Sequence, residues 1–183
     1  MALTYTPQAS SKMQMIPFAG PLVDGRHFDS QALNSRDIKV IAFICGHCPY
    51  VLAIEDRLIE FGKKLKTING ELLAICSNDP SENLEDTPAA LKQRAHEKSY
   101  SFDYLIDETQ EIAKKYGAVC TPDFFVFDKT GQLFYRGRLD DSWRDSKKVK
   151  NEEMWQAIQA RLKNQSVPEQ IPSMGCSIKW KNQ

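Results

Sequence analysis

Two apolar runs separated by an amphipathic segment dominate the hydrophobic pattern of the chain. Residues 38–44 are almost continuously apolar and rich in β-branched side chains, which is typical of a strand buried on both faces. From residue 49 to about 66, apolar side chains recur every three or four positions, which predicts an amphipathic helix. Residues 72–76 form a second apolar run. This order predicts a right-handed βαβ unit with parallel strands.

Other elements are predicted on both sides of this unit. Asp24-Gly25 lies between short apolar stretches and predicts an N-terminal β-hairpin, because glycine tolerates a positive φ. Residues 77–88 are polar and acidic and precede the weakly helical stretch 89–99, so we interpret them as an inserted segment. Further along, the pattern predicts a strand at 102–106, a helix at 108–116 ending at Gly117, and a hairpin of 123–128 with 132–139.

The end of the chain is predicted to be one helix and a tail. Asn151 is expected to cap a helix that carries Met154, Ala157, Ile158 and Leu162 on one face. A chain of 183 residues with 42% hydrophobic residues suits one domain. We therefore expect an α/β domain over residues 1–165, with a central sheet flanked by helices, and a tail over 166–183 packed on it.

The charge balance excludes some classes of partner. Lysine plus arginine and aspartate plus glutamate number 24 each, so no net positive field attracts nucleic acid or anionic lipid. No apolar stretch suits a signal peptide or reaches the roughly 20 residues of a membrane span. Five cysteines are too few for a disulfide framework. We expect a cytoplasmic protein that binds neither nucleic acid nor membrane and uses its cysteines chemically or buries them.

The candidate chemistry lies where the first strand meets the helix. Cys45 and Cys48 are separated by Gly46 and His47, and a C-x-x-C pair at the start of a helix inside a βαβ unit is typical of a redox dithiol. Unpaired N–H groups at a helix N-terminus stabilise a thiolate. We therefore expect Cys45 to be the nucleophile with a lowered pKa, assisted by His47, and Cys48 to resolve the mixed disulfide.

Two motifs carry a resemblance to the thioredoxin superfamily. Thr121-Pro122 opens a strand after a helix, and Cys45-Gly46-His47-Cys48 is identical to the active-site tetrapeptide of protein disulfide isomerases. Over roughly residues 15–163 the chain looks most like the redoxin branch, and particularly like peroxiredoxin-like bacterial proteins with a Cys-x-His-Cys-Pro-Tyr site. The resemblance implies a thioredoxin-like fold, a cis Pro122 that faces the dithiol, and a substrate edge shaped by Thr121 and Pro122.

The chain also departs from both families. Thioredoxins have Trp immediately before the first cysteine, where this chain has Ile44. Peroxiredoxins carry Pro-x-x-x-Thr-x-x-Cys, and aligning Cys48 with that cysteine places Ile41 at the proline and Cys45 at the threonine. Thiol–disulfide exchange is therefore the favoured function, and a thiol peroxidase is the first alternative. The expected partners are a protein or small molecule with a disulfide, and a reducing dithiol protein or glutathione.

A metal carrier is the second alternative. Cys45, Cys48 and either His47 or Cys120 could bind copper or zinc, but the chain has no second C-x-x-C or His-x-x-x-His to complete a site, so we expect neither metal nor cofactor. Cys120 is either an additional thiol beside the dithiol or buried and inert. Cys176 lies in the tail, which we expect to dock through Ile178 and Trp180. A resolving role for Cys176 is the alternative.

Overall fold

A five-stranded mixed sheet forms the centre of the protein. The computed structural model describes residues 3–7 and 13–181. The strand order in the sheet is β6-β5-β4-β8-β9. These strands are β4 (Ile38–Phe43), β5 (Gly70–Cys76), β6 (Asp103–Ile106), β8 (Asp123–Asp128) and β9 (Leu133–Tyr135). β4 lies in the middle, parallel to β5 and antiparallel to β8.

The predicted βαβ unit is confirmed. All six residues of β4 are buried, as its continuous apolar pattern requires, and α1 (Pro49–Lys66) connects it to the parallel strand β5. Pro49 occupies the first turn of α1, where its missing N–H has no partner within the helix. The loop that carries the two cysteines therefore lies between a central strand and the start of the longest helix.

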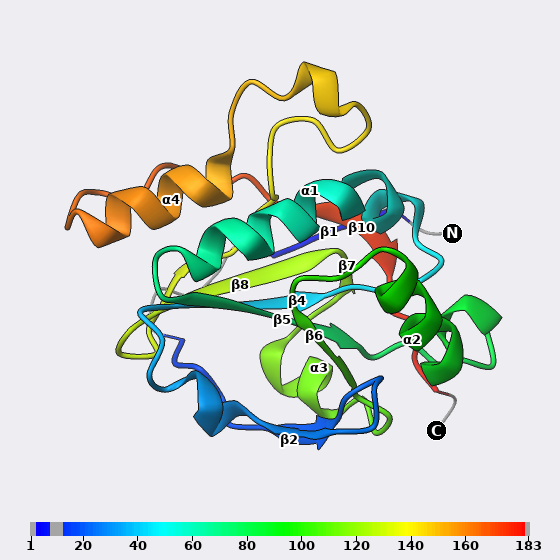
Figure 1. The fold of residues 1–183 in the computed structure, drawn as a ribbon. Helices are drawn as coiled ribbons and strands as arrows, with labels where there is room; N and C mark the ends of the chain where they lie inside the picture. Colours follow the sequence, from blue (N-terminus) through cyan, green and yellow to red (C-terminus); the bar gives the residue numbers. More distant parts are fainter. Residues whose placement is uncertain (1–2, 8–12, 182–183) are drawn as a thin grey trace.

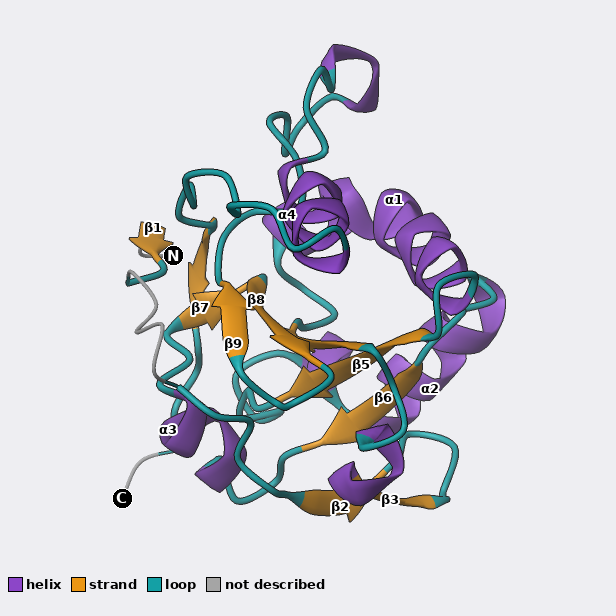
Figure 2. Cartoon of the chain, turned by 90° about the vertical axis from the view of Figure 1, so that its left-hand side faces the viewer, coloured by secondary structure: helices purple, strands orange, loops and turns teal. Residues whose placement is uncertain are grey.

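Helices cover both faces of the sheet, as expected for a thioredoxin-like fold. α1 and α4 (Glu153–Leu162) lie on one face, and α3 (Glu111–Tyr116) lies on the other with the hairpin of β2 (Ala19–Pro21) and β3 (His27–Asp29) (Figures 1 and 2). The core is divided accordingly into two apolar clusters, one on each side of the sheet. The hairpin turns at Gly25, whose φ of +95° confirms the predicted use of glycine there.

A second, smaller sheet was not predicted. β1 (Leu3–Tyr5), β10 (Met174–Ser177) and β7 (Cys120–Thr121) form it in the order β1-β10-β7, with antiparallel pairs. Gly175 makes the close pairing possible, because a Cβ there would lie 2.0 Å from the carbonyl oxygen of Thr121. Beyond β10, Ile178 is buried whereas Trp180 is 42% exposed. The last strand of the chain thus lies directly against the strand that precedes Pro122.

The predicted inserted segment is present and packs against the dithiol loop. It contains a short 3-10 helix, Leu84–Asp86, and α2 (Pro88–Glu97). Arg94 of α2 donates two hydrogen bonds to the buried carboxylate of Glu55 in α1. A Cβ on Gly46 would lie 2.2 Å from the carbonyl oxygen of Glu85, so only glycine fits at this position of the loop. The segment therefore belongs to the surroundings of the site.

Three expectations about individual elements are wrong. Asn151 does not cap α4, because its side chain donates to Asp141 and the helix begins two residues later. Leu162 is 42% exposed and lies outside the apolar face of α4. The predicted strand at 132–139 is shorter, since β9 covers only Leu133–Tyr135, and its pairing with β8 contains a register shift. In the part of the chain that the structure describes, no helix combines the length and apolarity needed to cross a membrane.

Candidate active site at the start of helix α1

Cys45 and Cys48 lie together in the loop between β4 and α1. Cys48 is the N-cap residue of α1 and has no exposed surface, and Cys45 is 2% exposed. Both sulfurs belong to the apolar cluster between the sheet and α1. A substrate can therefore reach either sulfur only after the surrounding side chains shift.

Thr121 contacts both sulfurs from β7. Its Oγ1 is hydrogen-bonded to Cys45 Sγ at 3.2 Å, and its carbonyl oxygen accepts a hydrogen bond from the Cys48 thiol at 3.0 Å. The peptide bond between Thr121 and Pro122 is cis. The structure thus brings Cys45 and Cys48 together with Thr121 and Pro122, although the two motifs are more than 70 positions apart in the chain.

The electrostatics of the pair favour a thiolate on Cys48. The pKa of Cys48 is lowered to about 5, first because the Cys45 thiol donates a hydrogen bond to its sulfur. The backbone N–H of Val51 and the side chain and backbone N–H of Cys176 also donate to it. Burial opposes the charge, but these four donors outweigh it. The Val51 contact is the predicted stabilisation by a helix N-terminus.

The contacts of Cys45 do not favour the lowered pKa that the sequence predicts for it. The pKa of Cys45 is raised well above its usual value, because it donates to Cys48, is buried and lies near the negative Asp86. Its position explains the reversal: Cys45 precedes the N-cap residue by three positions, so the unpaired N–H groups of the helix point to Cys48. In the reduced pair these contacts favour the thiolate on Cys48 over a thiolate on Cys45.

Asp86 is the principal site residue that the sequence did not indicate. Its buried carboxylate accepts hydrogen bonds from the backbone N–H of Gly46 at 2.7 Å and from the Asn78 side chain at 2.8 Å. It is also 2.7 Å from Nδ1 of His47. Asp86 lies in an acidic stretch that resembles many exposed loops, and only the packing against Gly46 distinguishes it.

The two ring nitrogens of His47 differ, because Nδ1 lies against a carboxylate and Nε2 has no hydrogen-bond partner among the described residues. Because Nδ1 faces a carboxylate, Nδ1 carries a proton and Nε2 is left to accept or donate another. Nε2 is buried and has no hydrogen-bond partner among the described residues. Cys45, His47 and Asp86 can each present one atom within 4.8 Å of the others. This trio could hold a metal ion, or it could move a proton to or from Cys45.

A buried ion pair supports the strand that follows Pro122. Asp123 accepts two hydrogen bonds from the guanidinium of Arg136, at 2.7 and 3.1 Å. Arg136 also donates to the carbonyl oxygen of Gly117, just after α3. Burial raises the pKa of Asp123, and Arg136 opposes this shift. The pair thereby fixes both ends of the short segment that contains Thr121 and Pro122.

The other cysteines differ in their relation to the dithiol. Cys120 is buried, its sulfur lies 3.8 Å from the carbonyl oxygen of Pro122, and burial raises its pKa. Cys76 is also buried, and burial raises its pKa to about 12. Cys176 is hydrogen-bonded to Cys48. Of these three thiols, the structure places Cys176 in contact with the candidate nucleophile.

A hollow beside Pro122 offers room for a substrate. It has a volume of about 270 Å³, and its lining is mainly apolar. Tyr50 and Trp143 form part of its wall, with their ring centres 4.5 Å apart, and Met174 of β10 forms another part. Trp143 is 38% exposed. An apolar group bound here would lie next to the start of α1.

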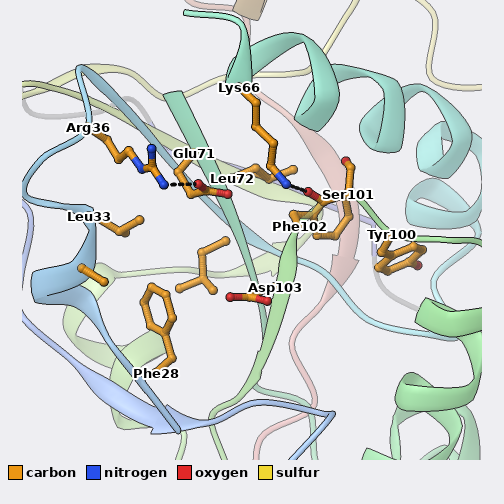
Figure 3. A pocket seen from close by; sticks show the side chains of 12 residues that line it. Phe28, Leu33, Arg36, Lys66, Glu71, Leu72, Tyr100, Ser101, Phe102 and Asp103 are labelled. Atoms are coloured by element: carbon orange, nitrogen blue, oxygen red, sulfur yellow. Dashed lines mark hydrogen bonds and ion pairs between the residues drawn. The ribbon is translucent and has the colours of Figure 1, made fainter. Parts of the chain in front are cut away.

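A larger cavity lies away from the dithiol. It has a volume of about 360 Å³ and is bounded by β5, the start of β6 and the end of α1 (Figure 3). Arg36 pairs with Glu71, and Lys66 donates to the carbonyl oxygen of Ser101. Its lining includes neither cysteine nor histidine among the described residues. We assign no chemistry to it.

Comparisons with known proteins place the chain in a family and a fold. The sequence pattern of the AhpC/TSA family matches residues 12–136. No curated protein matches the chain. A crystal structure of an uncharacterized conserved protein from Geobacillus kaustophilus is 40% identical, with a TM-score of 0.93 over 100% of this chain and 98% of the other.

Two further solved structures extend the comparison. A hypothetical protein from Sinorhizobium meliloti is 32% identical, with a TM-score of 0.93 over 98% of this chain and 100% of the other. A secreted disulfide oxidoreductase of Mycobacterium tuberculosis is 18% identical, with a TM-score of 0.55 over 63% of this chain and 79% of the other. The last likeness shows the thioredoxin-like fold alone.

Proposed function

The chain belongs to the AhpC/TSA family within the thioredoxin superfamily, and on that premise we propose that it is a thiol–disulfide oxidoreductase that uses Cys45 and Cys48. The observation that carries the proposal is the hydrogen-bonded pair of sulfurs at the start of α1, in which Cys48 has a pKa of about 5. A lowered pKa increases the fraction of thiolate at neutral pH, and the thiolate is the form that attacks a disulfide.

The reaction proceeds in two exchanges. The Cys48 thiolate attacks one sulfur of the substrate disulfide, the substrate S–S bond breaks, and the departing sulfur takes a proton. The Cys45 thiol then gives its proton to His47, whose Nε2 has no other partner among the described residues, and its sulfur attacks Cys48 Sγ. This step forms the Cys45–Cys48 disulfide and releases the second substrate thiol. The substrate gains two electrons and the protein loses two.

The partners follow from the surroundings of the site. The mainly apolar hollow beside Pro122 suits an apolar side chain next to the disulfide of a protein or of a small molecule. The oxidised pair is reduced again by glutathione or by another dithiol protein. A cytoplasmic location belongs to this proposal, because that compartment keeps such thiols reduced.

Asp86→Asn is expected to slow the second exchange about 100-fold, at the low end of the contribution of a positioned acid or base. The amide would donate to Nδ1 of His47, so Nε2 would carry the proton and could not accept one from Cys45. Rapid-quench kinetics with a labelled disulfide should then show the mixed disulfide accumulating. Glu85→Gln, on the exposed neighbouring residue, is the control and should not change either rate.

The function is tested by reduction of a model disulfide with a thiol cofactor in excess. The wild-type protein should turn over repeatedly, and peptide mapping should find a Cys45–Cys48 bond in its oxidised form and none in its reduced form. Absence of that bond after mild oxidation would overturn the proposal.

A thiol peroxidase is the second candidate, and the family favours it. The buried Cys48 with its lowered pKa also favours it, because a small peroxide reaches a buried sulfur more easily than a protein does. In this reaction Cys48 would take an oxygen atom from peroxide to form a sulfenic acid, and Cys45 would displace it as water. However, the Thr121 hydroxyl contacts Cys45 rather than Cys48. Stopped-flow measurement of peroxide consumption separates the two, since a dedicated peroxidase reacts far faster than an ordinary thiolate.

A further inference from the structure

Thr121 is in contact with three cysteines of the site. Thr121 is hydrogen-bonded to Cys45 through Oγ1, accepts a hydrogen bond from the Cys48 thiol through its carbonyl oxygen, and is paired with Cys176 in the register of β7 and β10. All three cysteines are at most 2% exposed and belong to the same apolar cluster. Cys176 therefore reaches the dithiol from the opposite end of the chain.

Cys48 is the central sulfur of this group. It accepts hydrogen bonds from the side chains of both Cys45 and Cys176, and from the backbone N–H of Cys176. β10 and α1 are also in contact with each other in the fold, and β10 lies beside β1 at the start of α1 (Figure 1). Since the thiols of Cys45 and Cys176 are both hydrogen-bonded to Cys48, these two sulfurs are the ones placed to form a disulfide with it.

We propose that Cys176 is a third redox thiol of this site, which exchanges with the Cys45–Cys48 disulfide to give a Cys48–Cys176 disulfide. The inference rests on the proposed function, because it starts from the oxidised dithiol. The Cys176 sulfur attacks Cys48 Sγ, the Cys45–Cys48 bond breaks, and the proton of Cys176 passes to the departing Cys45 sulfur. No electrons are gained or lost, so this isomerisation needs no further oxidant.

Oxidation removes the negative charge of Cys48, and this loss permits the exchange with Cys176. In the reduced site, burial and donation to Cys48 raise the pKa of Cys176 to about 12, which keeps Cys176 protonated. Oxidation of Cys48 removes the negative charge that holds this proton. The new bond joins β10 to the N-cap residue of α1, beside Pro122 and the hollow that Met174 lines. The C-terminal strand would thus be fixed covalently over the substrate side of the site.

Glutathione provides a direct test with two variants. Oxidised glutathione is added to reduced Cys45→Ser and to the double variant Cys45→Ser/Cys176→Ser, and non-reducing peptide mapping identifies the partner of Cys48. The double variant should retain glutathione on Cys48. The single variant should lose it and contain the Cys48–Cys176 bond. Cys45→Ser/Cys120→Ser is the matched control, because Cys120 is buried on the same strand as Thr121, and it should behave like the single variant.

The outcomes separate this inference from the proposed function. Retention of glutathione by the single variant, as in the double variant, overturns the third-thiol role and leaves the exchange by Cys45 and Cys48 in place. Failure of Cys48 to take glutathione in either variant overturns both. In the wild-type protein, mild oxidation should yield the Cys48–Cys176 bond alongside Cys45–Cys48, and Cys176→Ser should yield Cys45–Cys48 alone.

Discussion

Cys48→Ser is expected to reduce disulfide exchange to the rate measured without protein, because it removes the only thiol of the site with a lowered pKa among the described residues. Cys45 and Cys176 remain, but both have raised pKa values and supply little thiolate at neutral pH. The measurement is the initial rate of reduction of a model disulfide. A serine hydroxyl is close to the thiol in size, so the fold should be preserved.

A complementary double variant removes the two neighbouring thiols, Cys45 and Cys176, and leaves Cys48. Cys45→Ser/Cys176→Ser should still attack the substrate disulfide, and should stop at a stable mixed disulfide on Cys48. Mass spectrometry would show the substrate attached to that residue. Rapid exchange by Cys48→Ser, with the substrate held on Cys45, would instead support the order of events that the C-x-x-C motif alone predicts.

Arg136→Met is expected to destabilise the protein by about 3–5 kcal/mol, because it leaves the carboxylate of Asp123 buried without its partner. The cost is limited by proton uptake, since burial already raises the pKa of Asp123. For a chain of this size such a change lowers Tm by about 6–20 °C. Thermal unfolding at pH 7 followed by circular dichroism measures it.

A double variant separates the ion pair from the packing of Arg136. Asp123→Asn/Arg136→Met removes the unpaired charge as well, and should recover a substantial part of the lost stability. Equal Tm values for Arg136→Met and the double variant would show that the buried charge is not the cause. An unchanged Tm in Arg136→Met would contradict the role of the pair in supporting the segment that contains Thr121 and Pro122.

Much of the fold was predictable because its main elements have strong local patterns. The apolar run at 38–44, the helical period from Pro49 and the Asp24-Gly25 turn each specify one element with little dependence on distant parts of the chain. β1 and β10 have only three and four residues, and they exist because Gly175 allows close pairing with Thr121. Such short strands have no local hydrophobic period from which they could be predicted.

The chemistry was predictable in its residues but not in its charge distribution. The C-x-x-C motif identifies Cys45 and Cys48, yet the position of the helix N-cap decides which sulfur receives the N–H groups. Asp86 reaches the site through tertiary packing across 39 or more positions of the chain, so spacing could not reveal it, whereas Cys176 was named only as an alternative resolving thiol. The family resemblance, in contrast, was correct in its fold and superfamily.

Thiolate absorbance near 240 nm, followed from pH 3 to 10 in the reduced protein, tests the central assignment most directly. The account predicts one thiolate with a midpoint near pH 5, which disappears in Cys48→Ser and moves to higher pH in Cys45→Ala, where the strongest donor to Cys48 is lost. A midpoint near pH 5 that persists in Cys48→Ser and disappears in Cys45→Ala would place the charge on Cys45 and contradict the account.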